Sequence, residues 1–462
     1  MDKGMLKSSL TAIRTAQDGE AYTDRYIESG QAQSRRCTSK NRKGRYHTLL
    51  AYNDMNHSVL TRPEDVQAVF KDSDKHIKAK DNSSGYLMSQ LLGDCVGLIS
   101  QHEWKRVRTF CEPAFLRSNS SSHIAISDKC TEQHFQGLWE TSKLAEGTLD
   151  PREDLKMLPF WIIAKILYGE LSRDDEKELT GISRQREHLH KYVINGGLSR
   201  YSWSSYIPFL PSNRELAAFQ SRWFAFNQRI YRAALSTKKE IPLISMYQHV
   251  LSGEMSRAEL FQTIDEMLFT NLDVTLGAIS WNPFFLAAHP TVQSKLREEV
   301  LDRIQQGHDA MNDYIMKSQT FLAACISESA RLKPLAAFSV AQAAPTARVV
   351  CGYRIPAGTN FIVDSYAINQ RHSFWGLDSL IYRPERFLEK APHEYRYQYW
   401  RFGFGARQCL GKWVADVILR VLLVHLVKEY DLSLLDKDRD WERNPEVWIN
   451  HPVGQIRCTK RS

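Results

Sequence analysis

A single cysteine, Cys409, stands directly before the last long apolar stretch of the chain. It belongs to a glycine-rich segment, FGFGARQCLG at residues 402–411, and the stretch Leu410–Tyr430 that follows predicts a long helix. Backbone N–H groups at the start of a helix are unpaired, and together with the helix dipole they favour negative charge. Such a position lowers the pKa of a thiol. The pattern therefore predicts that Cys409 acts as a thiolate.

The residues around this cysteine limit what it can bind. Gly403, Gly405 and Gly411 allow the backbone to run close against a large partner. Arg407, two residues before the cysteine, offers a cation suited to carboxylates. These features suit a flat ligand that carries carboxylates and is bound through one thiolate. Haem held by a cysteine is such a ligand.

Three other interpretations of Cys409 need weighing. A lone cysteine is most often a small buried hydrophobic residue. A zinc site needs three or four ligands, and no other Cys or His lies within several residues of position 409. A nucleophilic cysteine needs a histidine partner, which can come from anywhere in the sequence. The ten-residue pattern as a whole favours haem over these alternatives.

Composition excludes several classes of protein. With 462 residues and 43% hydrophobic residues, the chain can bury a large core, so disorder throughout is excluded. Eight scattered cysteines form no C-x-x-C pair and indicate no disulfide framework. No apolar run reaches 18 residues, so we expect no membrane-spanning helix. The first thirty residues contain no apolar h-region, so we also expect no secretory signal.

The net charge of +8 is spread over the chain, except for one basic cluster between Arg35 and Arg45. A solvated basic strip is the ordinary explanation, and attraction to an anionic membrane or an acidic partner is the sharper one. The sequence lacks the stripe of aromatic and basic residues that is typical of nucleic-acid binding.

Apolar periodicity predicts helices over most of residues 60–330, then short strands with tight turns, then one last helix. This order favours one large, mainly α domain with small β-sheets (α+β) at 59–462, after an N-terminal segment at 1–58. The segments with the clearest patterns are Glu103–Phe110, Asp154–Tyr168, Asn213–Leu235, Arg257–Ala288, Thr291–Ile304 and Thr320–Leu332 as helices, and Arg348–Ile355 and Thr359–Asp364 as strands.

The segment 402–411 resembles the haem-binding signature F-x-x-G-x-R-x-C-x-G of the cytochrome P450 family. All five fixed positions match, namely Phe402, Gly405, Arg407, Cys409 and Gly411. The resemblance implies the mainly helical fold of that family. It also implies haem b as cofactor, Cys409 as the axial ligand of the haem iron, and the other four residues as parts of the haem-binding loop.

Two further segments resemble landmarks of the same family. Glu328-Ser-Ala-Arg331 is similar to its E-x-x-R motif, and the i,i+3 spacing puts both side chains on one helix face. Pro384-Glu-Arg386-Phe resembles the segment that adds a second arginine. The resemblance implies that Glu328, Arg331 and Arg386 form a structural network that locks the loop carrying Cys409. Without that context, the pair is an ordinary solvated ion pair.

The segment Trp104-Lys-Arg-Val-Arg108 resembles the family's W-x-x-x-R motif. One helical turn places Trp104 and Arg108 on the same face, and the resemblance implies that both contact a haem propionate. A basic surface helix is the alternative. The family's usual later arginine is not evident in Ala336–Ala344, where Gln342 stands near its place.

The segment Thr270–Gly277 aligns with the family's oxygen-activation pattern A/G-G-x-D/E-T-T, and departs from it twice. Asn271 replaces a small residue, and Val274 occupies the position of the usual alcohol. Asp273 and Thr275 remain. Cleaving bound dioxygen needs protons delivered along hydroxyls and water. We expect Asp273 to feed that chain and Asn271 or Thr275 to orient it, with an ion-paired or capping role as the alternative for Asp273.

The resemblance implies a haem-thiolate monooxygenase that takes electrons from NADPH through NADPH–cytochrome P450 reductase and oxidises a medium-sized organic substrate. Among family members it looks most like those of filamentous fungi that tailor secondary metabolites. Val274 keeps open a haem-thiolate isomerase, dehydratase or coupling enzyme, and a haem-binding sensor is the non-enzymatic alternative.

For location and partners we expect the cytosolic face of the endoplasmic reticulum, a monomer, and no nucleic acid. Tyr201–Leu210, apolar and aromatic, predicts either peripheral membrane contact or a lid over the pocket. Basic Lys105, Arg106, Arg401 and Lys412 form a candidate docking face for the reductase, with a plain solvated surface as the alternative.

Overall fold

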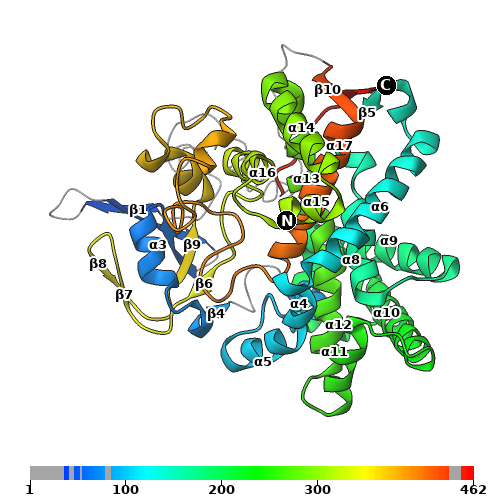
Figure 1. Ribbon diagram of the computed structural model, residues 1–462. Coiled ribbons are helices and arrows are strands. Elements are labelled where there is room, and N and C mark those ends of the chain that lie inside the picture. The colour runs from blue at the N-terminus through cyan, green and yellow to red at the C-terminus, as the bar shows by residue number, and fades with distance from the viewer. Residues whose placement is uncertain (1–35, 41–45, 53–54, 79–84, 436–448, 462) are drawn as a thin grey trace. The chain divides into compact units, whose positions relative to one another are not determined.

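The computed structural model describes residues 36–40, 46–52, 55–78, 85–435 and 449–461. Most of the basic cluster at 35–45 lies outside the described residues. The contacts within the chain group it into two compact units, coloured by residue number in Figure 1. Unit 1 comprises residues up to Ser73, Arg117–Pro159 and Asp273–Ser462, and unit 2 comprises Asp74–Leu116 and Phe160–Leu272.

Unit 1 contains the loop that carries Cys409, residues 402–411. Its α-helices are α3 (Pro63–Phe70), α6 (Ser120–Thr141), α7 (Pro151–Asp154), nearly all of α13 (Asn271–Ala288), α14 (Pro290–Gln305), α15 (His308–Met316), α16 (Phe321–Leu332) and α17 (Lys412–Glu429). Three short turns follow one another before the loop: η9 (Ala367–Arg371), η10 (Ser373–Trp375) and η11 (Pro384–Phe387).

Small sheets flank these helices. In unit 1 the largest runs in the order β1 (Arg36–Lys40), β2 (Tyr46–Tyr52), β3 (Met55–Leu60), β9 (Asn360–Val363) and β6 (Gln342–Ala343). Only β3 and β9 pair in parallel among these strands, with Ser58 opposite Phe361. The other sheets are β7 (Arg348–Val350) with β8 (Tyr353–Ile355), and β10 (Tyr430–Leu434) with β11 (Ile456–Lys460) and β5 (Thr148–Leu149). Residue 58, after which we expect the catalytic domain to begin, lies within β3.

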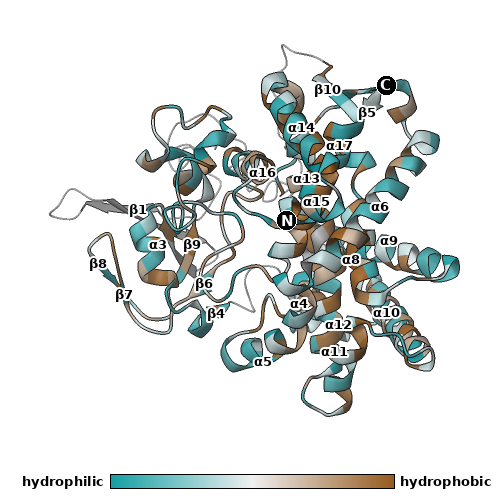
Figure 2. Cartoon of the chain, in the orientation of Figure 1, coloured by the Kyte–Doolittle hydropathy of each residue, from teal (hydrophilic) through white to brown (hydrophobic). Residues whose placement is uncertain are grey.

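Helices α16 and α17 form much of the core of unit 1. Ten of the twelve residues of α16 are buried, and α17 is buried on most of its faces from Val414 to Val427. Such a helix gains its stability from burial on several sides. Figure 2 shows the hydropathy of the residues along the helices. The hydroxyl of Thr320 caps α16 by accepting a hydrogen bond from the N–H of Ala323.

Unit 2 is almost entirely helical. It contains β4 (Ile77–Lys78), α4 (Gly85–Leu92), α5 (Gln101–Cys111), most of α8 (Leu158–Tyr168), α9 (Arg173–Asn195), α10 (Pro211–Ser236), α11 (Pro242–Leu251), α12 (Arg257–Asp265) and the π-helical turn η8 (Glu266–Thr270). Its core includes a run of aromatic rings in which Trp223 stacks on Phe219 and Phe226 and meets Phe269 edge-on. The indole N–H of Trp223 donates to the backbone oxygen of Phe261, so this large ring is buried without an unpaired donor.

The predicted fold class, mainly α with small sheets, is confirmed. The predicted run Arg257–Ala288 is helical throughout, but a π-helical turn, η8, separates α12 from α13. The predicted helix Asp154–Tyr168 is wrong in part, because the chain leaves the helix between Asp154 and Leu158. None of the described helices is both long and apolar enough to cross a membrane.

Candidate active site

The loop that carries Cys409 leaves a segment of turns and enters α17 at Lys412. The backbone N–H of Cys409 donates to the carbonyl of Phe402 at 2.9 Å, which closes the loop on itself. Gly403 and Gly405 adopt φ of +83° and +72°, a region that side chains rarely allow. A Cβ on Gly405 would lie 2.6 Å from the backbone oxygen of Phe70, so α3 packs directly against the loop.

Aromatic rings pack against Phe404 in the loop that carries Cys409. Phe404 is 6% exposed, and its ring lies 5.0 Å from Trp400, 5.2 Å from Tyr397 and 6.3 Å from Phe70. These rings belong to a buried cluster that also contains residues of β3, α3 and β9. Phe404 is buried between the half-buried Gly403 and Gly405. Its ring therefore anchors the loop to this cluster of unit 1.

Cys409 differs from the other cysteines whose side chains are described. Six of these seven are buried, and Cys409 is exposed. Burial raises the pKa of the Cys111 and Cys458 thiols to about 12, so neither ionises readily. Of this set, Cys409 is the thiol that a ligand can reach.

Glu328, Arg331 and Arg386 lie together in a buried cluster. The Glu328 carboxylate accepts hydrogen bonds from Arg331 Nε at 2.7 Å and Nη2 at 2.8 Å, and from Arg386 Nε at 2.9 Å. Both Glu328 and Arg331 are 0% exposed. Arg386 also donates to the carbonyls of Trp375 and Asp378, so η10 and η11 are held by the same guanidinium. This cluster ties α16 to the turns that precede the cysteine loop.

Asn369, which the sequence did not single out, joins this cluster to the cysteine loop. Arg331 Nη1 donates to the Asn369 carbonyl at 2.8 Å. The Asn369 side chain then pairs with both backbone groups of Trp400, donating to its carbonyl at 2.8 Å and accepting from its N–H at 2.6 Å. Trp400 stands two residues before Phe402. In the sequence, Asn369 begins the polar run Asn369-Gln-Arg371, and nothing in that run reveals its partner.

The residues expected on the oxygen side lie in the first turns of α13. Asp273 is exposed, Val274 is half-buried, and Thr275 is 8% exposed. Asn271 begins the helix, and its side chain lies outside the described part of the structure. One turn further, a Cβ on Gly277 would lie 2.8 Å from the Asn450 carbonyl, so α13 packs tightly against the segment near the C-terminus.

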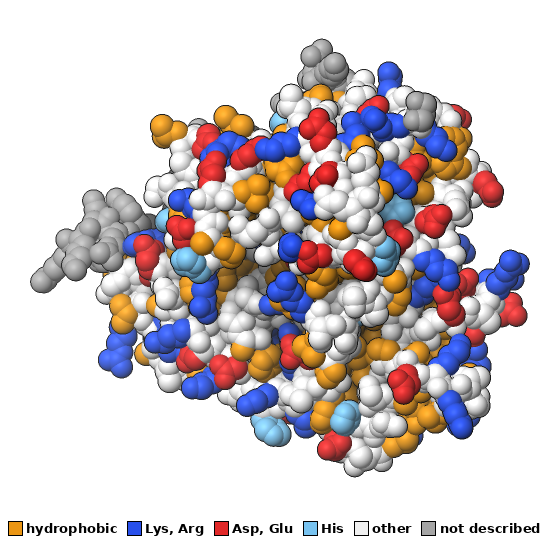
Figure 3. Space-filling model, in the orientation of Figure 1, with side chains coloured by type: hydrophobic (Ala, Val, Ile, Leu, Met, Phe, Trp, Pro, Cys, Tyr) orange, Lys and Arg blue, Asp and Glu red, His pale blue; other side chains and the backbone are white. Residues whose placement is uncertain are grey.

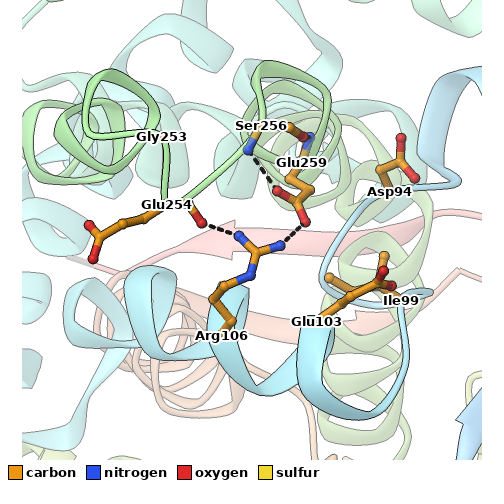
Figure 4. Close-up of a pocket in the computed structure, with 8 residues that line it drawn as sticks. All are labelled: Asp94, Ile99, Glu103, Arg106, Gly253, Glu254, Ser256 and Glu259. Carbon is orange, nitrogen blue, oxygen red and sulfur yellow. Dashed lines mark hydrogen bonds and ion pairs between the residues drawn. The ribbon is translucent and has the colours of Figure 1, made fainter.

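Trp104 and Arg108 lie on α5 of unit 2, one turn apart. Trp104 is 7% exposed, and Arg108 forms an ion pair with Glu112 at 2.9 Å. Their neighbour Arg106 lies beside a cavity of about 560 Å³. Figure 4 shows its guanidinium between the backbone oxygen of Glu254 and the carboxylate of Glu259. Both of these contacts of Arg106 therefore lie within unit 2.

The donor chemistry of the described residues fits haem better than a bare metal ion. These residues contain no group of three or more His, Cys, Asp or Glu side chains that could hold a metal. A single exposed cysteine can hold an iron ion only if other groups supply the remaining ligands, as a porphyrin does. Within the described part of the chain, Gln342 Oε1 is buried without a hydrogen-bond partner, which leaves a polar atom for a further group to satisfy.

Comparison with known proteins assigns the family. The cytochrome P450 family model matches residues 29–456. Cytochrome P450 monooxygenase aclC of Aspergillus oryzae is 50% identical over 407 residues, covering 87% of this chain and 82% of that protein. The monooxygenase asaD of Aspergillus flavus is 44% identical, covering 87% and 78%, and roqR of Penicillium rubens is 40% identical, covering 85% and 78%. The chain therefore belongs to the cytochrome P450 family and is an oxidoreductase of the monooxygenase type.

Proposed function

We propose that Cys409 ligates the iron of haem b, and that the enzyme uses it to oxidise a medium-sized organic substrate. The observation that carries this proposal is the exposed thiol of Cys409 at the entry to α17, next to glycines with positive φ. Haem bound there supplies dioxygen activation and the oxidation of a substrate C–H or C=C bond, with thiolate donation favouring O–O cleavage. The products that this chemistry allows are hydroxylated, epoxidised or oxidatively cyclised compounds.

Several residues are proposed to hold the haem. Arg407 in the loop, with Trp104 and Arg108 on α5, would bind the propionates through charge-assisted hydrogen bonds. Gly411 would let the loop approach the porphyrin closely, and Gly405 would keep the loop in the conformation that its φ of +72° allows. Phe402 accepts the hydrogen bond that orients Cys409.

The Glu328 cluster is proposed to act as a positioning network. It touches no reacting atom, but it connects through Asn369 to Trp400 and so to the start of the cysteine loop. Because guanidinium groups donate in a fixed planar arrangement, lysine at 331 or 386 would not reproduce these contacts.

Proton delivery is proposed to involve Asp273, with Thr275 or Asn271 orienting water. The side chain of Asp273 is exposed, whereas Thr275 is buried. Val274 offers no hydroxyl, so the substrate itself would have to supply one. This substitution favours the second candidate function, an isomerase, dehydratase or coupling enzyme without net oxygen insertion.

Electrons are proposed to come from NADPH through a reductase. Two of the four basic residues expected at the docking face form ion pairs within the chain, Arg106 with Glu259 and Arg401 with Asp416. On the face drawn in Figure 3, lysine and arginine side chains are interspersed with acidic ones rather than gathered in one patch. Lys105 and Lys412 are the remaining candidates.

For the rest of the assignment we propose a catalytic domain at 59–462, a monomer, and secondary-metabolite biosynthesis at the cytosolic face of the endoplasmic reticulum. Peripheral membrane contact would use the aromatic residues after α9, since Tyr206 is 86% and Phe209 is 79% exposed. Aromatic side chains such as tyrosine favour the membrane–water interface, because the ring is apolar and the hydroxyl can stay in water.

The first experiment compares Cys409→Ser with Ala406→Ser. Both add a hydroxyl to an exposed position of the same loop. We expect Cys409→Ser to lose the thiolate-type absorbance of the ferrous carbon monoxide complex, and Ala406→Ser to keep it. Haem binding with an unchanged spectrum in Cys409→Ser would overturn the proposal.

A second experiment separates the two candidate functions. Product formation is measured together with consumption of NADPH and dioxygen across a panel of fungal metabolites. Stoichiometric consumption supports the monooxygenase reaction. Turnover without either co-substrate would establish the isomerase or dehydratase instead.

A further inference from the structure

An ion pair closes the cysteine loop at its base. Arg401, the residue before the loop, places Nη2 2.7 Å from Asp416 Oδ1 on α17. Their side chains are 14% and 15% exposed. The Arg401 guanidinium also lies over the Phe402 ring, 4.4 Å from its centroid. The two ends of the segment that presents Cys409 are therefore joined by opposite charges.

A second arginine shares the same carboxylate. Arg420, one helical turn after Asp416, has Nη2 3.7 Å from Asp416 Oδ2, and donates from Nη1 to the Lys317 carbonyl at 3.1 Å. Its side chain is 9% exposed. Two guanidiniums against one carboxylate leave this trio with a net charge of +1 in a partly buried place.

Asp416 stabilises the charged form of Arg401, which is the nearer of the two arginines. Burial by itself would lower the pKa of Arg401, but the carboxylate of Asp416, with Tyr399 and Cys409 adding smaller contributions, raises it. Burial lowers the pKa of Arg420, and Arg401 adds to that effect. Arg401 is thus firmly protonated, and Cys409 is among the groups whose negative charge it feels.

Two contacts connect this cation to the backbone of Cys409. Arg401 covers the ring of Phe402, and the Phe402 carbonyl accepts the hydrogen bond from the Cys409 backbone. Charges act over several ångströms where water is excluded, because the local dielectric is low. A cation held here reduces the electron donation of a thiolate, and a carboxylate beside it restores part of that donation.

We propose that the Arg401–Asp416 ion pair sets the charge felt by the Cys409 thiolate, and thereby the reduction potential of the iron bound to it. Arg401 and Asp416 are positioning residues, since they act through Cys409 and touch no substrate. The inference rests on the proposed binding of haem at Cys409.

The test measures the midpoint reduction potential of the haem-loaded enzyme by spectroelectrochemical titration. Asp416→Asn raises the charge of the trio to +2, so the reduced iron is favoured and the potential rises. Arg401→Gln lowers that charge to 0, so the potential falls. We expect each change to alter the reduction equilibrium by about tenfold, which is about 59 mV for one electron. The double variant returns the charge to +1 and the potential towards that of the wild type.

Two controls separate charge from packing. Arg401→Lys keeps the cation and loses the planar stacking, and should stay within about threefold of the wild-type equilibrium. Asp431→Asn removes a carboxylate that pairs with Arg297 at the same distance of 2.7 Å, on β10 and α14, and should leave the potential unchanged.

Equal potentials for wild type, Asp416→Asn and Arg401→Gln would overturn the inference, as would shifts in the same direction. If Arg401→Gln fails to retain haem, the comparison of Asp416→Asn with Arg401→Lys decides. A wild-type enzyme that binds no haem would instead refute the proposed function, so the two failures are distinguishable.

Discussion

Asn369→Ala is the substitution that most directly tests how the cysteine loop is held. It removes both side-chain hydrogen bonds to Trp400 and leaves the Glu328 cluster in place, because Arg331 contacts only the Asn369 backbone. A buried polar group that loses its partner costs about 1–3 kcal/mol. Trp400 is half-buried, so we take the lower part of that range for its N–H and its carbonyl. The expected loss of unfolding free energy is about 2–4 kcal/mol.

The assay is urea unfolding of the haem-loaded enzyme, together with the fraction that shows thiolate-type carbon monoxide absorbance. We expect a lower midpoint, an unchanged slope with denaturant, and a smaller thiolate fraction. Gln370→Ala is the matched control, since it removes a hydrogen bond to the Leu332 carbonyl, at the end of α16, and none to the loop. The reasoning is refuted if Asn369→Ala unfolds at the wild-type midpoint with its thiolate fraction intact.

Three further predictions concern stability, and each is checked by equilibrium unfolding. Glu328→Gln leaves the buried Arg331 without its counter-charge and Arg386 with Asp378 alone. It should cost about 3–5 kcal/mol, so a loss below 1 kcal/mol would contradict a buried network. Burial raises the pKa of Asp265 to about 6 even though its arginine partner opposes the shift. The native carboxyl therefore holds a proton that the unfolded chain has lost between about pH 4 and 6, and unfolding free energy falls as pH rises through that range, by roughly 3 kcal/mol at most. Asp265→Asn should abolish this slope. Gly405→Ala should cost at least about 1–3 kcal/mol for the positive φ alone, and retained wild-type stability would show that the loop can move away from Phe70.

Local periodicity was enough for most helices. Thr291–Ile304 and Thr320–Leu332 were predicted within one residue of α14 and α16, because apolar spacing and flanking Pro290 and Thr320 act within one turn. Helices α6 and α9 were not delimited, although Ser172 and Asp175 form a capping box that marks the start of α9. The polar residues of α9 masked its narrow apolar face.

The π-helical turn η8 was beyond the reach of the sequence. In unit 2, the Gly97 N–H donates to the Glu266 carboxylate, and Arg186 pairs with the buried Asp265. These contacts come from residues about 80 to 170 positions away in the chain. Periodicity predicts a continuous helix over these residues. The π-helical turn depends on partners far away in the chain, which periodicity does not reveal.

The sequence by itself determined the family, the mainly helical fold and the cysteine at the entry of α17, because these depend on residue types at short, fixed spacings. It also placed Glu328 and Arg331 on one helix face. Only the tertiary structure decided that Asn369 joins their cluster to Trp400, and that Arg401 faces inward to Asp416 rather than outward to a partner. The physical reason is that a polar side chain carries no mark of its partner. Which donor meets which acceptor is settled when helices and turns far apart in the chain are packed together and their polar groups lose water.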